Sequence, residues 1–161
     1  MKNVSILLIL IAFLQNEVFS QDRNDDLKGT LDWIKNKVEN YPVNTGPLAV
    51  SKAVFTYDLV TYDISVIYHT KQGTSEIKSN LKDLSFDMAL YDGYSFKIGC
   101  KTGKCSTEII RWGEDNPEVY IYPTFELVFD GEAFKSLNLE ERMKKAFTDA
   151  ISMSGGKRDK Y

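Results

Sequence analysis

The chain has 161 residues, of which 43% are hydrophobic and 27% are charged, and its formal net charge is −3. These values are typical of a globular protein, so they exclude a disordered acidic tail and a polytopic membrane protein. No positive excess is present to neutralise phosphates, so a strongly basic nucleic-acid-binding protein is excluded as well. The composition leaves the biochemical role open.

The N-terminus predicts where the protein goes. Lys2 provides a short positive start, and residues 4–14 form an uninterrupted apolar run. That run is too short for a bilayer-spanning helix, which needs about 20 residues. A positive start, a short apolar run and a polar exit are typical of a secretory signal peptide. We expect cleavage between Ser20 and Gln21, which leaves an exported protein, secreted or periplasmic, without a stable membrane span. The alternative is a retained N-terminal anchor helix.

The remaining chain is predicted to form one domain. It contains no internal repeat and no Pro-, Ser- or Gly-rich linker, and its length suits a single hydrophobic core. We therefore divide the sequence into a signal peptide (1–20), a short flexible N-terminus (21–25), one domain (26–154) and a flexible polar tail (155–161).

Two helices are predicted, one at each end of the domain. The first covers residues 26–40, with Asp25 or Asp26 as its N-cap and Pro42 beyond its end. The second follows Asn138, which together with Glu141 matches a capping box. Each helix carries one apolar stripe at helical spacing. The stripes are Leu27, Leu31, Ile34, Val38 and Tyr41 in the first helix, and Met143, Ala146, Phe147, Ala150 and Ile151 in the second.

Between the helices, the period of the apolar residues changes to two, which predicts strands. Asp92-Gly93 is a strong signal for a short hairpin, and short turns between the other segments favour an antiparallel meander. The expected strands cover residues 48–57, 62–68, 75–78, 85–90, 94–100, 105–112 and 118–129, the last one bent near Pro123.

The fold class is therefore α+β, with about seven antiparallel strands, an N-terminal helix and a C-terminal capping helix. This order across residues 48–154 resembles the pleckstrin-homology-like barrel, in which the C-terminal helix plugs one open end. The alternative is a strongly bent open sheet with both helices on one face. The lipid-headgroup binding of that family is not expected here, because residues 58–63 carry acidic side chains where the family gathers Lys and Arg.

Cys100 and Cys105 are the only cysteines, and in an exported protein they are expected to form a disulfide. We place them in a hairpin between the strands over 94–100 and 105–112, where Ile98 would face Thr107 and Phe96 would face Ile109. The small loop makes this bond a staple of the hairpin rather than the main support of the fold. Two ligands do not make a structural zinc site, so no metal is expected.

No catalytic residue can be assigned. His69 is the only histidine, and no nucleophile or metal-binding motif surrounds it or the nearby Asp58 and Asp63. The carboxylate pairs Glu114/Asp115 and Glu140/Glu141 are explained by a turn and by the first turn of a helix. No Gly-rich phosphate loop is present, and no cofactor is expected.

One surface is a candidate binding site. Alternation along the last two strands places Ile110, Trp112, Tyr120 and Tyr122 on a face opposite the expected core. Such an aromatic stripe would bind a glycan, a peptide or a partner protein. The interpretation that we favour is that the N-terminal helix covers this face, because a one-sided helix and an apolar sheet face without a partner satisfy each other.

We therefore expect an exported, non-catalytic binding module. The alternative is an enzyme of unrecognised type that uses carboxylate and Tyr side chains. A concave pocket that gathers titratable groups would distinguish the two.

Overall fold

The computed structural model describes residues 24–43, 49–91, 93, 95–113 and 116–155. This part of the chain contains three α-helices and eight antiparallel strands in two sheets, which confirms the α+β class. The five-stranded sheet has the order β1-β2-β3-β6-β7, and the three-stranded sheet has the order β4-β5-β8. The described strands do not close into a barrel. Their bounds are β1 Val50–Tyr57, β2 Asp63–Thr70, β3 Gly73–Asn80, β4 Leu84–Tyr91, β5 Ser95–Cys100, β6 Ser106–Trp112, β7 Glu118–Tyr122 and β8 Thr124–Val128.

The chain crosses between the two sheets at three points, from β3 to β4, from β5 to β6 and from β7 to β8, and the last two crossings are neighbours. The expected long strand over 118–129 is two strands, because Pro123 separates β7 in the larger sheet from β8 in the smaller one. The segment between Cys100 and Cys105 makes the other crossing, from β5 to β6. Because β6 pairs with β7 and β5 pairs with β8, these four strands form one antiparallel ribbon that changes sheets at a shared corner.

This ribbon corrects the expected meander. β1, β2 and β3 follow one another as predicted, but the next neighbour of β3 is β6, and β4 pairs with β5 in the other sheet. The predicted turn at 92–93 joins β4 to β5, although Asp92 itself lies outside the described residues. Between β3 and β4, a short 3-10 helix covers Leu81–Asp83.

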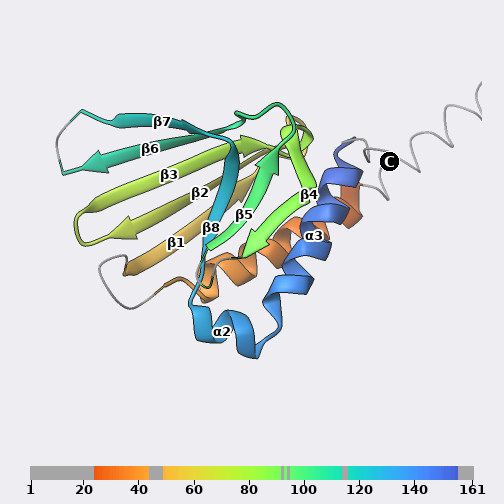
Figure 1. Ribbon diagram of the computed structural model, residues 1–161, viewed down its shortest axis with the longest axis horizontal. Coiled ribbons are helices and arrows are strands. Elements are labelled where there is room, and N and C mark those ends of the chain that lie inside the picture. The colour runs from red at the N-terminus through yellow and green to blue at the C-terminus, as the bar shows by residue number, and fades with distance from the viewer. Residues whose placement is uncertain (1–23, 44–48, 92, 94, 114–115, 156–161) are drawn as a thin grey trace, which may run out of the picture.

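The N-terminal helix covers residues 24–40 and buries its predicted stripe completely at Leu27, Leu31, Ile34 and Val38. Asp25 and Asp26 lie within the helix, so neither is its N-cap. The helix lies beside β1, at the opposite edge of the larger sheet from β7 (Figure 1). Glu39 accepts a hydrogen bond from the backbone of Phe55 at 3.0 Å, which ties the helix to β1.

The C-terminal helix α3, Leu139–Met153, covers one face of the smaller sheet. Phe147 is buried, and its ring lies 6.0 Å from that of Phe96 and 6.4 Å from that of Phe125. The predicted stripe is therefore the docking face, and Gly155 ends the helix in the left-handed region at φ 89°. Asn138, however, is itself left-handed (φ 49°) and makes no side-chain cap, so the capping box does not form.

A short helix that was not predicted, α2 (Gly131–Ser136), precedes α3 and is capped by the Asp130 side chain. No helix in the described part of the chain is long and apolar enough to cross a membrane. The predicted signal peptide over 1–20 and the tail beyond Gly155 lie outside the described residues.

Candidate functional site

The four residues of the predicted aromatic stripe lie on one face of the larger sheet. Residues two apart along a strand share a face, and so do residues directly opposite each other on paired strands. Tyr120 is opposite Glu108, and Ile110 is opposite Glu118, so Ile110, Trp112, Tyr120 and Tyr122 share that face with both carboxylates. We call these four residues the aromatic face. Trp112, Tyr120 and Tyr122 are 41%, 42% and 40% exposed.

The four residues share a face, but it is not the face opposite the core that the sequence predicted. We expected Ile109 to face the core and the aromatic side chains to point away from it. Instead, Glu108 is opposite Ile77 on β3, and Ile77 is opposite the buried Val66 on β2. The aromatic face therefore continues the core-facing side of the sheet. Its rings are exposed because β6 and β7 extend beyond the helices and the smaller sheet (Figure 1).

The N-terminal helix, the predicted cover for this face, packs elsewhere. Asp32 accepts a hydrogen bond of 2.6 Å from the Tyr57 hydroxyl on β1, and the Arg142 guanidinium of α3 lies 5.2 Å from the centre of the Trp33 ring. These contacts hold the helix between β1 and α3, across the sheet from β7.

A cavity of about 300 Å³ opens beside the aromatic face, between the two sheets. Tyr122 belongs to the aromatic face and also lines the cavity. The side chains that line the cavity come from five strands of the larger sheet, from β8 and from no helix: Val50, Tyr68, Thr70, Ser75, Ile77, Glu108, Tyr122, Thr124, Glu126 and Val128. This volume is at the lower limit of cavities that hold small ligands.

Two carboxylates enter the cavity, one from each sheet. Glu108 of β6 accepts a hydrogen bond of 2.6 Å from the Ser75 hydroxyl, and no described Lys, Arg or His forms an ion pair with it. Glu126 of β8 accepts a hydrogen bond from the Ser95 hydroxyl, and Lys97 Nζ lies 3.8 Å away. The cavity therefore carries excess negative charge.

The two tyrosines of the cavity keep their protons. Burial raises the pKa of Tyr122, and the charge of Glu108 and a hydrogen bond to it raise that pKa further. Burial also raises the pKa of Tyr68, strongly enough to outweigh the opposing hydrogen bond from the Val128 N–H. At neutral pH both phenols are hydrogen-bond donors and aromatic surfaces rather than proton acceptors.

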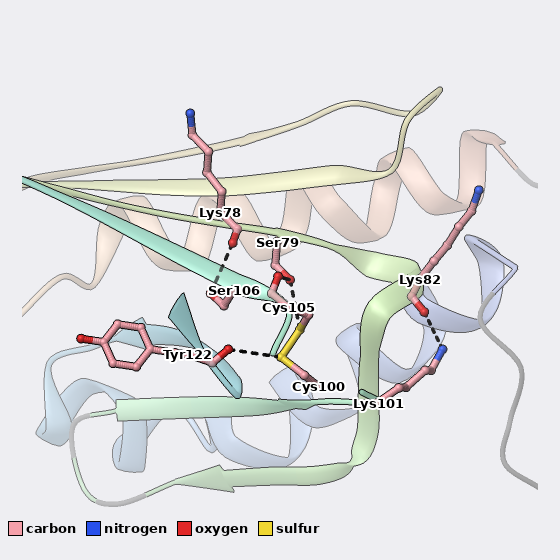
Figure 2. Close-up of a disulfide and its surroundings, with 8 residues drawn as sticks. All are labelled: Lys78, Ser79, Lys82, Cys100, Lys101, Cys105, Ser106 and Tyr122. Atoms are coloured by element: carbon pink, nitrogen blue, oxygen red, sulfur yellow. Dashed lines mark hydrogen bonds between the residues drawn. A yellow bond between two sulfur atoms is a disulfide. The ribbon is translucent and has the colours of Figure 1, made fainter. Parts of the chain in front are cut away.

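The disulfide between Cys100 and Cys105 is present, with the two Cα atoms 5.5 Å apart, but it does not staple a hairpin. β5 and β6 belong to different sheets, so Ile98 is opposite Phe125 rather than Thr107. Phe96 is opposite Leu127, and Ile109 is opposite Val119. The bond joins the end of β5 to the chain just before β6, at the corner where the ribbon changes sheets (Figure 2).

Backbone hydrogen bonds hold the crossing from β7 to β8 against this corner. Cys100 N donates to Pro123 O at 2.8 Å, and Cys105 N donates to Tyr122 O at 3.3 Å. Ser79 on β3 donates its hydroxyl to Cys105 O at 3.0 Å (Figure 2). The disulfide therefore fixes the corner from which Tyr122 projects toward the cavity.

The remaining candidates from the sequence are not brought together. His69 lies near one end of β2 and Asp63 at the other, roughly 20 Å apart for a strand of this length. Glu140 and Glu141 lie in the first turn of α3, as expected, and both pair with Lys144. Glu114 and Asp115 lie outside the described residues. No cluster of three or more potential metal ligands occurs where the structure is described.

The cavity carboxylates were not predicted from the sequence. Glu108 and Glu126 sit on strands that the sequence places in one continuous meander, and their meeting depends on the change of sheet at Pro123. The only available signal was strand alternation. It places Glu126 on the opposite face of its strand from the buried Phe125 and Leu127. Comparison with protein-family models, with curated proteins and with solved structures found no match for the chain.

Proposed function

We propose that the protein is an exported, non-catalytic binding module that holds a positively charged segment of a protein or peptide partner against the aromatic face. One observation carries this proposal: three partly exposed aromatic rings share one face with the carboxylates Glu108 and Glu118. Aromatic faces attract Lys and Arg, and carboxylates accept their hydrogen bonds.

The local charges support a cationic partner. In the described part of the chain, neither Glu108 nor Glu118 has an ion-pair partner. Arg111 alternates to the opposite face of β6, where it lies 3.7 Å from Glu76. Glu118 accepts a hydrogen bond of 2.7 Å from the Tyr120 hydroxyl. The face therefore presents negative charge and aromatic surface together.

The test is selection from a random peptide library with the oxidised protein. Selected peptides should be enriched in Arg and Lys, and their affinity should fall as ionic strength rises. Trp112→Ala should weaken a selected peptide by about tenfold or more, the usual loss at a central aromatic contact. Val60→Ala is the matched control, because Val60 is exposed in a turn before β2 and should leave affinity unchanged.

Two results would reject this function. One is a selected set without Arg or Lys enrichment. The other is unchanged affinity in Trp112→Ala. Binding to an oligosaccharide array with the same Trp112 dependence would instead assign the face to a glycan.

Export is part of the proposal. It rests on the N-terminal sequence, and the Cys100–Cys105 disulfide is compatible with an oxidising compartment. The intact mass of protein recovered outside the cytoplasm should correspond to a chain that begins at or near Gln21. A mass that includes Met1 would contradict cleavage.

An enzyme is the second candidate, because the cavity gathers Glu108, Glu126, Tyr68 and Tyr122. The raised pKa values of the two tyrosines remove them as general bases near neutral pH. The two carboxylates that line the cavity already accept hydrogen bonds from serine hydroxyls. This arrangement supports binding more directly than catalysis.

A further inference from the structure

β7 is the edge strand of the larger sheet, and its exposure is unusual. All five of its residues are exposed, including Val119 at 59% and Ile121 at 60% on the face opposite Tyr120 and Tyr122. Within the described chain, β7 pairs only with β6, so its outer edge offers unpaired backbone groups. Natural proteins usually protect such edges with Lys, with bulges or with a covering element. Among the described residues, β7 contains no Lys and no bulge, and no other element covers its outer edge.

We propose that the edge of β7 pairs with β7 of a second copy of this chain, antiparallel and about a two-fold axis at Tyr120. In this register Tyr120 is opposite Tyr120 of the second copy, Val119 is opposite Ile121, and Glu118 is opposite Tyr122. The aromatic and β-branched pairs are those that stabilise sheets, and no charge meets a like charge. The sequence of β7 therefore complements itself.

The flanking prolines select this register. Pro117 and Pro123 lie three residues before and after Tyr120, and proline cannot donate a hydrogen bond to a strand ladder. Pairing about Tyr120 uses all five residues of β7 and leaves both prolines outside. Pairing about Val119 would place Pro117 opposite Ile121, and pairing about Ile121 would place Pro123 opposite Val119.

The surroundings leave room for a second copy. β7 lies at the outer edge of the larger sheet, and the helices lie toward the opposite edge of that sheet (Figure 1). A two-fold pair would extend the five-stranded sheets into one continuous sheet. The two aromatic faces would then adjoin across the axis and remain open, because edge pairing uses backbone groups.

Analytical ultracentrifugation over a concentration series tests this pairing. The oxidised wild-type protein should show a monomer–dimer equilibrium. Tyr120→Lys and Tyr120→Glu should each raise the dimer dissociation constant by about tenfold, because each places like charges opposite one another on the axis. An equimolar mixture of the two variants should recover dimers, since Lys then faces Glu.

Val60→Lys is the matched control, because it adds the same charge at an exposed apolar residue far from β7 and should not change the dissociation constant. Unchanged urea midpoints for the Tyr120 variants would show that they fold. A wild-type protein that is monomeric throughout would overturn the proposal and leave the edge for an extended segment of another protein. Dimers insensitive to both charges, or a mixture that fails to recover dimers, would also overturn it.

Discussion

Tyr68 connects the two sheets through a single buried hydrogen bond. Its side chain projects from β2, and its hydroxyl accepts a bond of 2.8 Å from the backbone N–H of Val128 on β8. Tyr68 is only 4% exposed, so water cannot replace the hydroxyl. A buried N–H group left without an acceptor costs about 1–3 kcal/mol.

Tyr68→Phe should therefore lower the free energy of unfolding by about 1–3 kcal/mol in urea denaturation at neutral pH. Tyr120→Phe is the control, because the Tyr120 hydroxyl bonds the exposed Glu118, and this variant should keep the wild-type urea midpoint. Equal urea midpoints for the two variants would show that the hydrogen bond from Val128 to Tyr68 does not stabilise the folded protein.

The raised pKa of Tyr68 also predicts that the protein loses stability at high pH. Burial raises its pKa in the folded protein above the usual 10.0; the Val128 bond opposes this shift and the charge of Glu126 adds to it. Above pH 10 the unfolded chain releases the proton while the folded protein keeps it, so stability falls by about 1.4 kcal/mol per pH unit. Below pH 10 the effect is absent.

Tyr68→Phe should remove this slope. The comparison is urea denaturation of wild type and variant between pH 9 and pH 11. The other tyrosines titrate in both proteins, so the difference isolates Tyr68. Stability curves that stay parallel over this range would contradict the assignment.

Among the elements, α3 depends most clearly on one residue. Phe147 contacts both Phe96 and Phe125 of the smaller sheet and is almost completely buried. Phe147→Ala should cost about 3–5 kcal/mol in urea denaturation. Lys144→Ala, one turn earlier, removes only exposed ion pairs with Glu140 and Glu141 and should cost less than about 1 kcal/mol. Similar midpoints would mean that α3 does not dock through Phe147.

The disulfide supports the corner between the sheets. Its loop is short, so a chain-entropy calculation gives a contribution of about 2 kcal/mol. The double variant Cys100→Ser/Cys105→Ser should lose about that amount of stability in urea while keeping the wild-type m-value, because the backbone bonds at Pro123 and Tyr122 remain. Unchanged stability would show that those bonds alone hold the corner.

The elements that the sequence predicted are those with local signals. The stripe from Leu27 to Val38 and the stripe from Met143 to Ile151 each bury one helix face, and alternation located the strands. The pairing of β5 with β8 rather than with β6 was not predictable in this way, because a short connection favours a hairpin and both arrangements give the same alternation. The helix α2 was missed because six residues around Phe134 are too few for a periodic pattern.

In the whole molecule, too, the parts of the candidate site with a local sequence signal were predicted, and the parts that depend on tertiary structure were not. Trp112 and Tyr120 were placed together correctly because β6 and β7 are consecutive and paired. Glu126 was not placed near Glu108, because the turn at Pro123 carries the chain from β7 into the smaller sheet, and alternation along one strand does not reveal this change. The aromatic face is therefore a surface that local pattern predicts, whereas the cavity beside it is created only by the tertiary structure.

The proposed function requires that the aromatic face binds positive charge. The most direct measurement is amide chemical-shift mapping of the oxidised protein with N-acetyl-arginine amide, with the neutral N-acetyl-citrulline amide as the matched control ligand. We expect arginine-dependent shifts to cluster on β6 and β7 around Trp112, Tyr120 and Glu108, and to weaken as salt is added. Equal shifts with citrulline, or shifts that gather away from these strands, would contradict the proposed function.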